Sequence, residues 1–285
     1  MKNLQGKVAA ITGAGSGIGQ ALALHLARQG CHLALSDINQ QSLDETQGKL
    51  ANYDVTVTQQ QLNVANEQEV YQWAEQVEQQ HGKVNLIFNN AGVALSGTVE
   101  GLSLDEYRWV MDINFWGVVY GTKAFLPKLA ASGDGHVINI SSIFGLASQP
   151  LMSGYNASKF AVRGFTESLR QDLELTGAKV SATCVHPGGI KTNIAQSARM
   201  TASVKAATGI DNEDSIKDFE RLFFNTPASA AKAIVNGVMH NKRRVLIGPD
   251  ATLFDLLVRL FPSSYQRIFT KVVKYRAKKA LNNPD

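Results

Sequence analysis

The sequence has few cysteines and no long apolar run, and both absences narrow the class of protein. Cys31 and Cys184 are the only cysteines among 285 residues, and neither they nor the six histidines have the spacing of metal ligands. Both cysteines lie in apolar, strand-like runs, which predicts buried thiols in a reducing compartment. No apolar run reaches the ~20 residues of a membrane span, and the beginning of the chain lacks the features of a secretory signal. We therefore expect a cytoplasmic protein with no metal site.

The main part of the sequence also lacks an excess of charge of either sign. Residues 250–285 hold seven Lys/Arg and three Asp, which accounts for the whole net charge of +4. The rest of the chain balances 21 basic against 21 acidic side chains. The pI near 9.0 thus comes from the C-terminal segment, and a basic face for nucleic acid is not expected.

What the sequence does have is a regular alternation of short apolar runs with longer helical patterns. This alternation predicts a doubly wound, Rossmann-like parallel sheet of about seven strands in an α/β domain. The predicted strands are Val8–Thr12, Cys31–Ser36, Val55–Gln60, Val84–Asn89, His136–Ser141, Lys179–His186 and Arg244–Ile247. The predicted helices lie near Gly17–Gln29, Gln40–Ala51, Glu67–His81, Leu104–Ala131, Tyr155–Leu175 and Pro227–Val238.

Two segments depart from this alternation. Residues 189–226 form a long insertion within the expected 1–250 domain, and such insertions are often substrate lids. Its apolar side chains, together with the C-terminal segment, indicate a hydrophobic substrate; they are Ile190, Ile194, Ala195, Ala198 and Met200. Residues 251–285 combine apolar and basic residues, which is typical of amphipathic helices. This extension could pack on its own or a partner subunit, lie on a membrane surface, or cover the substrate.

A glycine-rich turn follows the first predicted strand. Its glycines, Gly13, Gly17 and Gly19, have the spacing Gly-x-x-x-Gly-x-Gly. Glycines between a strand and a helix let the backbone approach a pyrophosphate at the helix N-terminus. Asp37, at the end of the second strand, can accept hydrogen bonds from an adenosine ribose and repels a 2′-phosphate, which favours NAD over NADP. Alternatively, Asp37 only caps the next helix.

Tyr155 and Lys159 are four residues apart and would share one face of a helix. A nearby ammonium favours phenolate, so Lys159 is expected to lower the pKa of Tyr155 and make the phenol useful as a general acid or base. A pair of this kind on the surface would have the same spacing. The catalytic interpretation of this pair therefore depends on the other motifs of the chain.

Taken in order, the motifs resemble those of the short-chain dehydrogenase/reductase family over about residues 4–250. The motifs are Gly13-x-x-x-Gly17-x-Gly19, Asn89-Asn90-Ala91-Gly92, Ser142, Tyr155-x-x-x-Lys159 and Pro187-Gly188. The resemblance implies that Tyr155 exchanges a proton with the substrate oxygen while Lys159 assists it. It also implies that Ser142, rather than Ser141, binds that oxygen, and that Asn114, in a locally distorted helix, holds a water that links Lys159 to solvent.

The resemblance further implies a set of cofactor contacts. Asn89 and Gly92 are the members of the Asn-Asn-Ala-Gly turn expected nearest the adenosine, Asn63 stands where the family usually has Asp, and Ile140 is expected to face nicotinamide. The full set of expected cofactor-binding residues is Gly13, Gly15, Ser16, Gly17, Ile18, Gly19, Asp37, Asn63, Val64, Asn90, Ala91, Gly92, Tyr155, Lys159, Pro187, Gly188, Ile190 and Thr192.

The function implied by the resemblance is an NAD-dependent oxidoreductase that interconverts an alcohol and its ketone or aldehyde. The alternative is a catalytically idle dinucleotide-binding sensor or scaffold. Dehydration or epimerisation on the same scaffold is disfavoured, since such relatives usually have a different glycine spacing. The family commonly forms dimers and tetramers, so a homo-dimer or homo-tetramer is expected, with a possible peripheral membrane contact through the extension.

Overall fold

A seven-stranded parallel sheet forms the centre of the computed structural model, which describes residues 3–192, 194, 196–211 and 225–282, the last four as backbone only. The strand order is β3-β2-β1-β4-β6-β7-β9. The strands are β1 Val8–Thr12, β2 His32–Asp37, β3 Val57–Gln61, β4 Leu86–Asn89, β6 Gly135–Ile140, β7 Val180–Pro187 and β9 Arg244–Ile247. A second, parallel pair consists of β5 Leu95–Ser96 and β8 Arg199–Met200.

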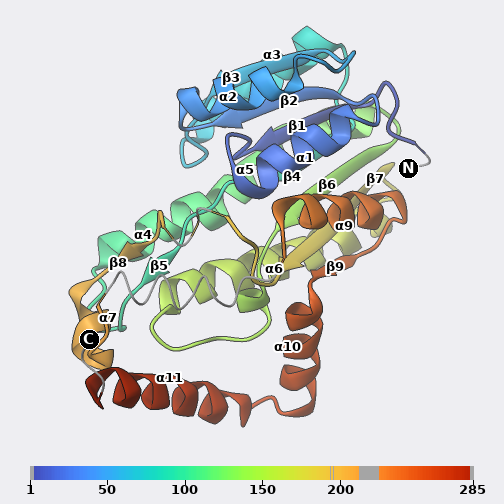
Figure 1. The fold of residues 1–285 in the computed structure, drawn as a ribbon. Helices are drawn as coiled ribbons and strands as arrows, with labels where there is room; N and C mark the ends of the chain where they lie inside the picture. Colours follow the sequence, from blue (N-terminus) through green and yellow to red (C-terminus); the bar gives the residue numbers. More distant parts are fainter. Residues whose placement is uncertain (1–2, 193, 195, 212–224, 283–285) are drawn as a thin grey trace.

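Helices cover both faces of the sheet (Figure 1). One face carries α1 Gly17–Ala27, α2 Gln40–Leu50 and α9 Pro227–Met239. The other carries α3 Glu67–His81, α5 Gly117–Ala131 and α6 Ser153–Leu175. The other helices in the described residues are α4 Leu104–Met111, the π-helix Asp112–Trp116, the 3₁₀-helix Ile143–Gly145, α7 Ala202–Thr208, α10 Pro249–Leu260 and α11 Tyr265–Asn282.

The side chains of β1 explain why the chain must be wound on both faces. Ala9 and Ile11 belong to the core beneath α1 and α9, whereas Val8 and Ala10 belong to the core beneath α3 and α5. Successive side chains of a strand point to opposite faces, so a strand that is apolar throughout needs cover on both. The predicted doubly wound fold is thereby confirmed.

Local signals fix several helix bounds where they were predicted. The Asn66 side chain accepts hydrogen bonds from the Gln68 and Glu69 amides at the start of α3, and Gly82 ends that helix with φ +72°. Thr226 and Ser229 form a capping box at α9, with Pro227 in the first turn. Most other predicted bounds differ by one or two residues.

The single helix predicted over Leu104–Ala131 is wrong in one respect. The structure divides it into α4, the π-helix Asp112–Trp116 and α5. A π-helix inserts a residue into the helical repeat without breaking the chain's direction. Residues Asp112–Trp116 include neither glycine nor proline, so only the resemblance, which placed Asn114 in a locally distorted helix, indicated this position.

The carboxyl ends of all seven strands meet at one edge of the sheet, because every pair in the sheet is parallel. The strand order reverses at β1: the chain moves outward from β1 to β2 and β3, and the connection from β3 then crosses back to β4 on the other side of β1. Ligands of open α/β sheets bind at such a switch point. The predicted site residues at the ends of β1, β2, β4, β6 and β7 therefore share this edge.

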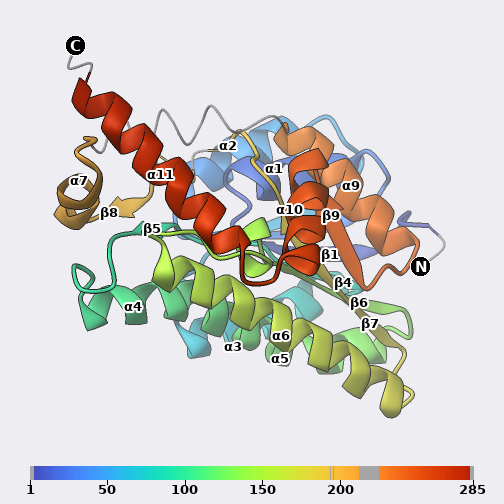
Figure 2. The ribbon, with the colours of Figure 1, turned by 90° about the horizontal axis from the view of Figure 1, so that it is seen from below.

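The C-terminal extension forms two helices that pack partly on the rest of the chain. Figures 1 and 2 show α10 descending from β9 and α11 running back toward α7. Tyr265 is buried and its hydroxyl accepts a hydrogen bond from the Ser148 amide at 3.1 Å. The Phe269 ring packs edge-on against Phe254 and Tyr265. Among the described residues, no helix is both long and apolar enough to span a bilayer.

Candidate functional site

The glycine-rich turn between β1 and α1 has the shape that a pyrophosphate needs. Gly13 and Gly17 have φ values of +66° and +53°, which favour glycine. A Cβ on Gly13 would lie 2.9 Å from the Ala91 Cα, so only glycine fits against the neighbouring turn. In the part of the chain that the structure describes, the Ser16 side chain makes no capping hydrogen bond to α1. The first-turn N–H groups of α1 remain for an anion.

Asn90 ties this turn to the one after β4. The Asn90 side-chain nitrogen donates to the backbone carbonyls of Thr12 and Gly13 at 2.9 and 3.2 Å. The Thr12 hydroxyl oxygen in turn accepts from the Asn90 and Ala91 amides, both at 3.0 Å. No motif in the sequence indicated a role for Thr12. Its position at the strand end was visible, but its partners lie 78 and 79 residues away.

The Asn89 side chain points away from the glycine-rich turn, so the approach of its backbone to the adenosine stays a prediction. The structure buries its side chain, whose amide nitrogen donates to Asn139 at 2.8 Å and to Thr122 at 3.2 Å. The alternation of side chains along β4 directs Asn89 to α5, away from the glycine-rich turn. Asn90, one residue later, takes the place beside the turn.

Asp37 sits at the end of β2 and faces the glycine-rich turn. One carboxylate oxygen accepts from the Gly15 amide at 2.9 Å, and the other accepts from the Asn39 amide at 3.0 Å. The cap of α2 is Asn39, whose side chain accepts from the Ser42 amide. The alternative role of Asp37 as the helix cap is therefore wrong, and its half-buried carboxylate remains beside the turn.

Asn63 and Val64 follow β3 on the adjacent part of the same edge. The Asn63 side-chain oxygen accepts from the Ala65 amide at 3.1 Å, and the Asn63 amide donates to Glu69 at 3.0 Å. Val64 lies against Gly117 at the start of α5. The asparagine thus shapes its own turn, and its contact with adenine stays a prediction.

The segment after β7 packs against the glycine-rich turn. A Cβ on Gly17 would lie 3.1 Å from the Thr192 methyl group, so the two segments touch. The Asp250 carboxylate accepts from the Gly189 amide at 2.6 Å, and Asn225 donates to the Gly189 carbonyl at 3.3 Å. Asp250 and Asn225 hold the Pro187–Thr192 segment, and no sequence signal identified either residue, since they are remote in the chain.

Tyr155, Lys159 and Ser142 come together at the carboxyl end of β6. Tyr155 and Lys159 occupy successive turns near the start of α6, and the Lys159 nitrogen lies 5.8 Å from the centre of the Tyr155 ring. That nitrogen donates to the Ile140 carbonyl at 3.2 Å. Ser142 precedes the 3₁₀-helix, and its hydroxyl hydrogen-bonds the Tyr155 phenol. All three side chains are more than nine-tenths buried.

Ser141 has a different task from its neighbour. Its hydroxyl donates to the Lys159 carbonyl at 2.8 Å and is fully enclosed. It thereby fixes α6 to the end of β6, and no hydrogen bond joins it to the phenol in the described part of the chain. The geometry supports the choice of Ser142 over Ser141 as the group that faces a substrate oxygen.

Burial, rather than Lys159, dominates the acidity of Tyr155. Loss of solvent raises the pKa of Tyr155 above its ordinary value of 10.0, while the hydrogen bond with Ser142 acts in the lowering direction. The net shift of the Tyr155 pKa is therefore opposite to the expected one, because burial outweighs any lowering by Lys159. Burial also lowers the pKa of Lys159 to about 8. At neutral pH both groups carry their protons, which suits proton donation to a carbonyl oxygen.

Asn114 lies inside the π-helix, as the predicted local distortion requires, and is fully buried. Its side-chain oxygen accepts from the Val93 amide at 2.8 Å, and its nitrogen donates to the Val93 carbonyl and the Ser158 hydroxyl, both at 3.0 Å. A Cβ on Gly92 would lie 3.1 Å from Asn114 and 3.3 Å from the Lys159 nitrogen. Asn114 thus places the turn after β4 directly against the lysine.

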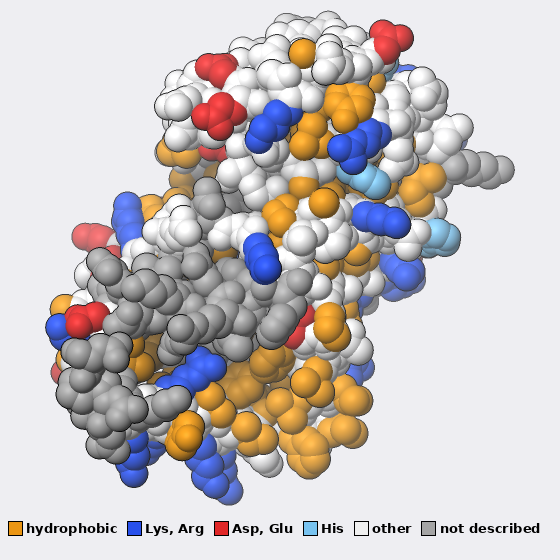
Figure 3. Space-filling model, viewed as in Figure 1, with side chains coloured by type: hydrophobic (Ala, Val, Ile, Leu, Met, Phe, Trp, Pro, Cys, Tyr) orange, Lys and Arg blue, Asp and Glu red, His pale blue; other side chains and the backbone are white. Residues whose placement is uncertain are grey.

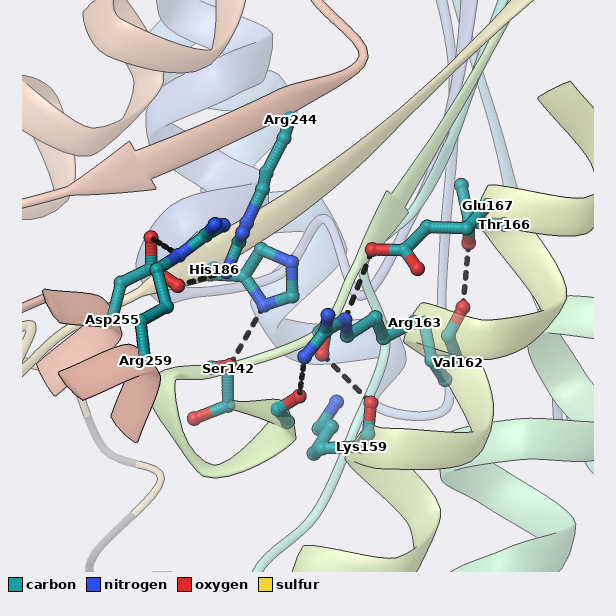
Figure 4. A network of polar contacts seen from close by, with 12 residues as sticks. Ser142, Lys159, Val162, Arg163, Thr166, Glu167, His186, Arg244, Asp255 and Arg259 are labelled. Carbon is teal, nitrogen blue, oxygen red and sulfur yellow. Dashed lines mark hydrogen bonds and ion pairs between the residues drawn. The ribbon is translucent and has the colours of Figure 1, made fainter. Parts of the chain in front are cut away.

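His186 forms a hydrogen bond with the backbone of Ser142 (Figure 4). Its Nδ1 lies 2.9 Å from the Ser142 carbonyl, and since a carbonyl only accepts, this nitrogen carries the proton. Burial lowers the pKa of His186 to about 4. The ring is therefore neutral at physiological pH and positions the Ser142 backbone without adding charge to the site.

An apolar cluster surrounds the Tyr155 ring. Its buried members come from the loop after β4, the 3₁₀-helix and the start of α6 and α10, and they are Ala94, Ile143, Phe144, Met152 and Ala251. Ile194, Ala198 and Phe254 pack against this cluster from the insertion and from α10. Ala195, which the sequence analysis grouped with them, lies outside the described residues.

Replacing Lys159 by methionine is expected to stabilise the protein at pH 7, because a buried ammonium is removed. A lysine whose folded pKa lies near 8 instead of 10.5 costs on the order of 3 kcal/mol when it is charged. The cost is complete below pH 8 and disappears as pH rises to the unfolded value near 10.5. The gain in unfolding free energy should therefore shrink from pH 7 to 10.5 in denaturant titrations, and a less stable variant at pH 7 would contradict this.

The fold and the edge of the sheet together define a Rossmann-type α/β protein with a dinucleotide cradle. Three features fit such a cofactor. The glycine-rich turn has no room for side chains, the N-terminus of α1 has no side-chain cap, and the Asp37 carboxylate lies beside both. Comparison with known proteins makes the class more specific: the family model "short chain dehydrogenase" matches residues 7–203. The chain belongs to this family and is an oxidoreductase of the short-chain dehydrogenase/reductase type.

Individual relatives agree with this assignment. SadH of Mycobacterium tuberculosis (strain ATCC 25618 / H37Rv), which bears the name of an oxidoreductase, is 46% identical over 94% of this chain and 95% of its own. C alpha-dehydrogenase of Sphingobium sp. (strain NBRC 103272 / SYK-6) is 31% identical over 88% and 83%. A short-chain dehydrogenase/reductase of Burkholderia phymatum, solved in complex with NAD, has a TM-score of 0.85 and 30% identity over 93% and 97%.

Proposed function

We propose that the protein interconverts a hydrophobic alcohol and its ketone or aldehyde with NAD as the hydride carrier. The convergence of the Ser142, Tyr155 and Lys159 side chains beside the glycine-rich cradle carries this proposal. In the reducing direction the Tyr155 hydroxyl gives its proton to the carbonyl oxygen, and in the oxidising direction it takes the proton of the alcohol. NAD, when bound, accepts or returns the hydride of the carbinol carbon.

The other residues of the site have supporting roles in this proposal. Ser142 donates to the substrate oxygen and so favours the charge that develops on it. Lys159, still protonated near pH 7, favours the phenolate that remains after Tyr155 has given up its proton. The turns held by Asn90 and Asp250 position the two ends of the cofactor.

The preference for NAD over NADP rests on Asp37. Its carboxylate lies beside the glycine-rich turn, next to the proposed position of the adenosine ribose, and neither Ser16 nor Ile38 adds a positive charge. Two ribose hydroxyls can donate to a carboxylate, whereas a 2′-phosphate is repelled by it. The NAD-bound relative from Burkholderia phymatum is consistent with this preference.

The apolar cluster around Tyr155 supports a hydrophobic substrate. Phe144, Met152 and Phe254 offer apolar surface next to the phenol, and the 189–226 segment is proposed as the lid over it. We also propose a homo-dimer or homo-tetramer, a cytoplasmic location and a catalytic domain over residues 1–250, as the family resemblance implies.

Absorbance of the reduced nicotinamide tests the proposed function directly. Purified protein is incubated with NAD and a series of primary and secondary alcohols, and with NADH and the matching carbonyl compounds. Turnover should rise from short to longer alkyl or cyclic substrates, because more apolar surface is buried. Saturable NAD binding without turnover on any substrate would instead favour the idle sensor or scaffold.

A further inference from the structure

The two C-terminal helices expose more apolar surface than their packing explains. Leu253, Leu256 and Leu260 of α10 are 64%, 53% and 62% exposed. Their spacing of three and four residues places them in one stripe along the helix. The stripe is separate from Ala251 and Phe254, which contact the cluster around Tyr155. In Figure 3 hydrophobic side chains gather over α10 and the turn that follows it.

The next helix, α11, repeats this pattern and adds charge. Tyr265, Phe269 and Val273 lie on its more buried side. Ile268, Val272 and Tyr275 form a neighbouring exposed stripe, with 47%, 46% and 71% exposure. A basic stripe lies beside this exposed stripe, because each of its apolar residues is directly preceded by a cation. The cations are Arg267, Lys271 and Lys274.

Within the described part of the chain, the cations of the basic stripe have no acidic partner. Residues 265–278 contain no Asp or Glu. Among the described residues, Arg267, Lys271 and Lys274 form no ion pair, whereas Arg259 of α10 pairs with Asp255 at 3.0 Å. Figure 3 shows Lys and Arg side chains along the lower edge of the molecule, below α11. The positive charge of this edge therefore remains available to an external anion.

We propose that α10 and α11, here called the C-terminal arm, dock the protein on the surface of an anionic lipid bilayer. Adjacent apolar and basic stripes on helices that are too polar to span a bilayer are typical of interfacial binding. The leucine stripe enters the boundary between headgroups and acyl chains, and the basic stripe contacts lipid phosphates. Long Lys and Arg side chains can reach those phosphates while their stems stay in apolar surroundings.

A second copy of the chain fits this surface less well. A two-fold contact would use the same patch on both subunits. It would bring two basic stripes together, and neither stripe has acidic residues within residues 265–278 to offset the other. An anionic surface satisfies both the apolar stripes and the unpaired cations.

Co-sedimentation of the full-length protein with lipid vesicles tests the proposal. The protein should sediment with mixed phosphatidylcholine–phosphatidylglycerol vesicles and remain in the supernatant with phosphatidylcholine alone. Added salt should release it, because exposed charges are screened. The variant R267Q/K271Q/K274Q should partition on the order of a hundredfold less, at roughly fivefold per cation.

A matched variant separates a local effect from a loss of net charge. Lys83, Lys123 and Lys242 are exposed and, among the described residues, have no ion pair. The variant K83Q/K123Q/K242Q loses the same charge and should bind anionic vesicles as the unaltered protein does. Equal losses in both triple variants, or protein that stays in the supernatant with both kinds of vesicle, would overturn the proposal.

A third variant distinguishes lipid from a partner copy. L253S/L256S/L260S should lose at least tenfold in vesicle partition and keep its sedimentation mass in solution. If this variant changes from an oligomer to a monomer while its vesicle binding is unaltered, the stripe is an interface between copies and the proposal fails. Thermal unfolding of each variant checks that these exposed substitutions leave the fold intact.

Discussion

Replacing Tyr155 by phenylalanine should lower kcat by about 10²–10⁴-fold, the usual contribution of a positioned general acid or base. The ring stays within its apolar cluster, and only the proton and oxygen that face Ser142 are removed. The dissociation constant for NAD should change little, because the glycine-rich turn and Asp37 are untouched. Steady-state kinetics at saturating cofactor and a direct binding titration measure the two effects separately.

Tyr107 offers a matched control for this substitution. It lies close to the start of α6, where its hydroxyl shares a 2.6 Å hydrogen bond with Ser153. Tyr107→Phe removes the same atom from a neighbouring tyrosine without touching the proposed proton path. Its kcat should stay within a few-fold of the unaltered enzyme. Near-normal turnover of Tyr155→Phe would refute the assigned role.

Replacing Asp37 by asparagine should reduce the preference for NAD over NADP by about ten- to a hundredfold. Hydrogen bonds to a charged group contribute about 1.5–3 kcal/mol, which corresponds to this range. The amide keeps an acceptor for the Gly15 N–H but no longer repels a 2′-phosphate. The ratio of kcat/KM for the two cofactors is the quantity to measure.

Asp44 on α2 provides the control, since its exposed carboxylate makes hydrogen bonds only to Gln40 and Gln59 in the described part of the chain. Asp44→Asn makes the same charge change nearby and should leave the cofactor ratio unaltered. If Asp37→Asn also leaves it unaltered, or if the unaltered protein prefers NADP, the assignment of Asp37 to the ribose is incorrect.

The Tyr155–Lys159 pair shows how tertiary burial changes a sequence argument. Four residues of separation correctly indicated neighbouring positions on one helix. The electrostatic conclusion drawn from that spacing did not hold, because burial raises the pKa of Tyr155 and lowers that of Lys159. Desolvation depends on the helices and loops that enclose both groups, and none of these is visible in a five-residue motif.

The sequence by itself determined the fold class and the location of the cradle. Apolar strands that need cover on both faces, glycines at the end of the first strand and helix caps such as Asn66 are local features, and each acts within a few residues. They fix which segments become strands and helices, and parallel pairing then brings the strand ends to one edge.

Only the tertiary structure decided which residue of each motif faces the site. It directed Asn90 rather than Asn89 to the glycine-rich turn, and it made Asp250 the support of the Pro187–Thr192 segment. The physical reason is that side-chain direction within the sheet and contacts across 50 or more residues depend on how the layers pack. No local pattern contains that information.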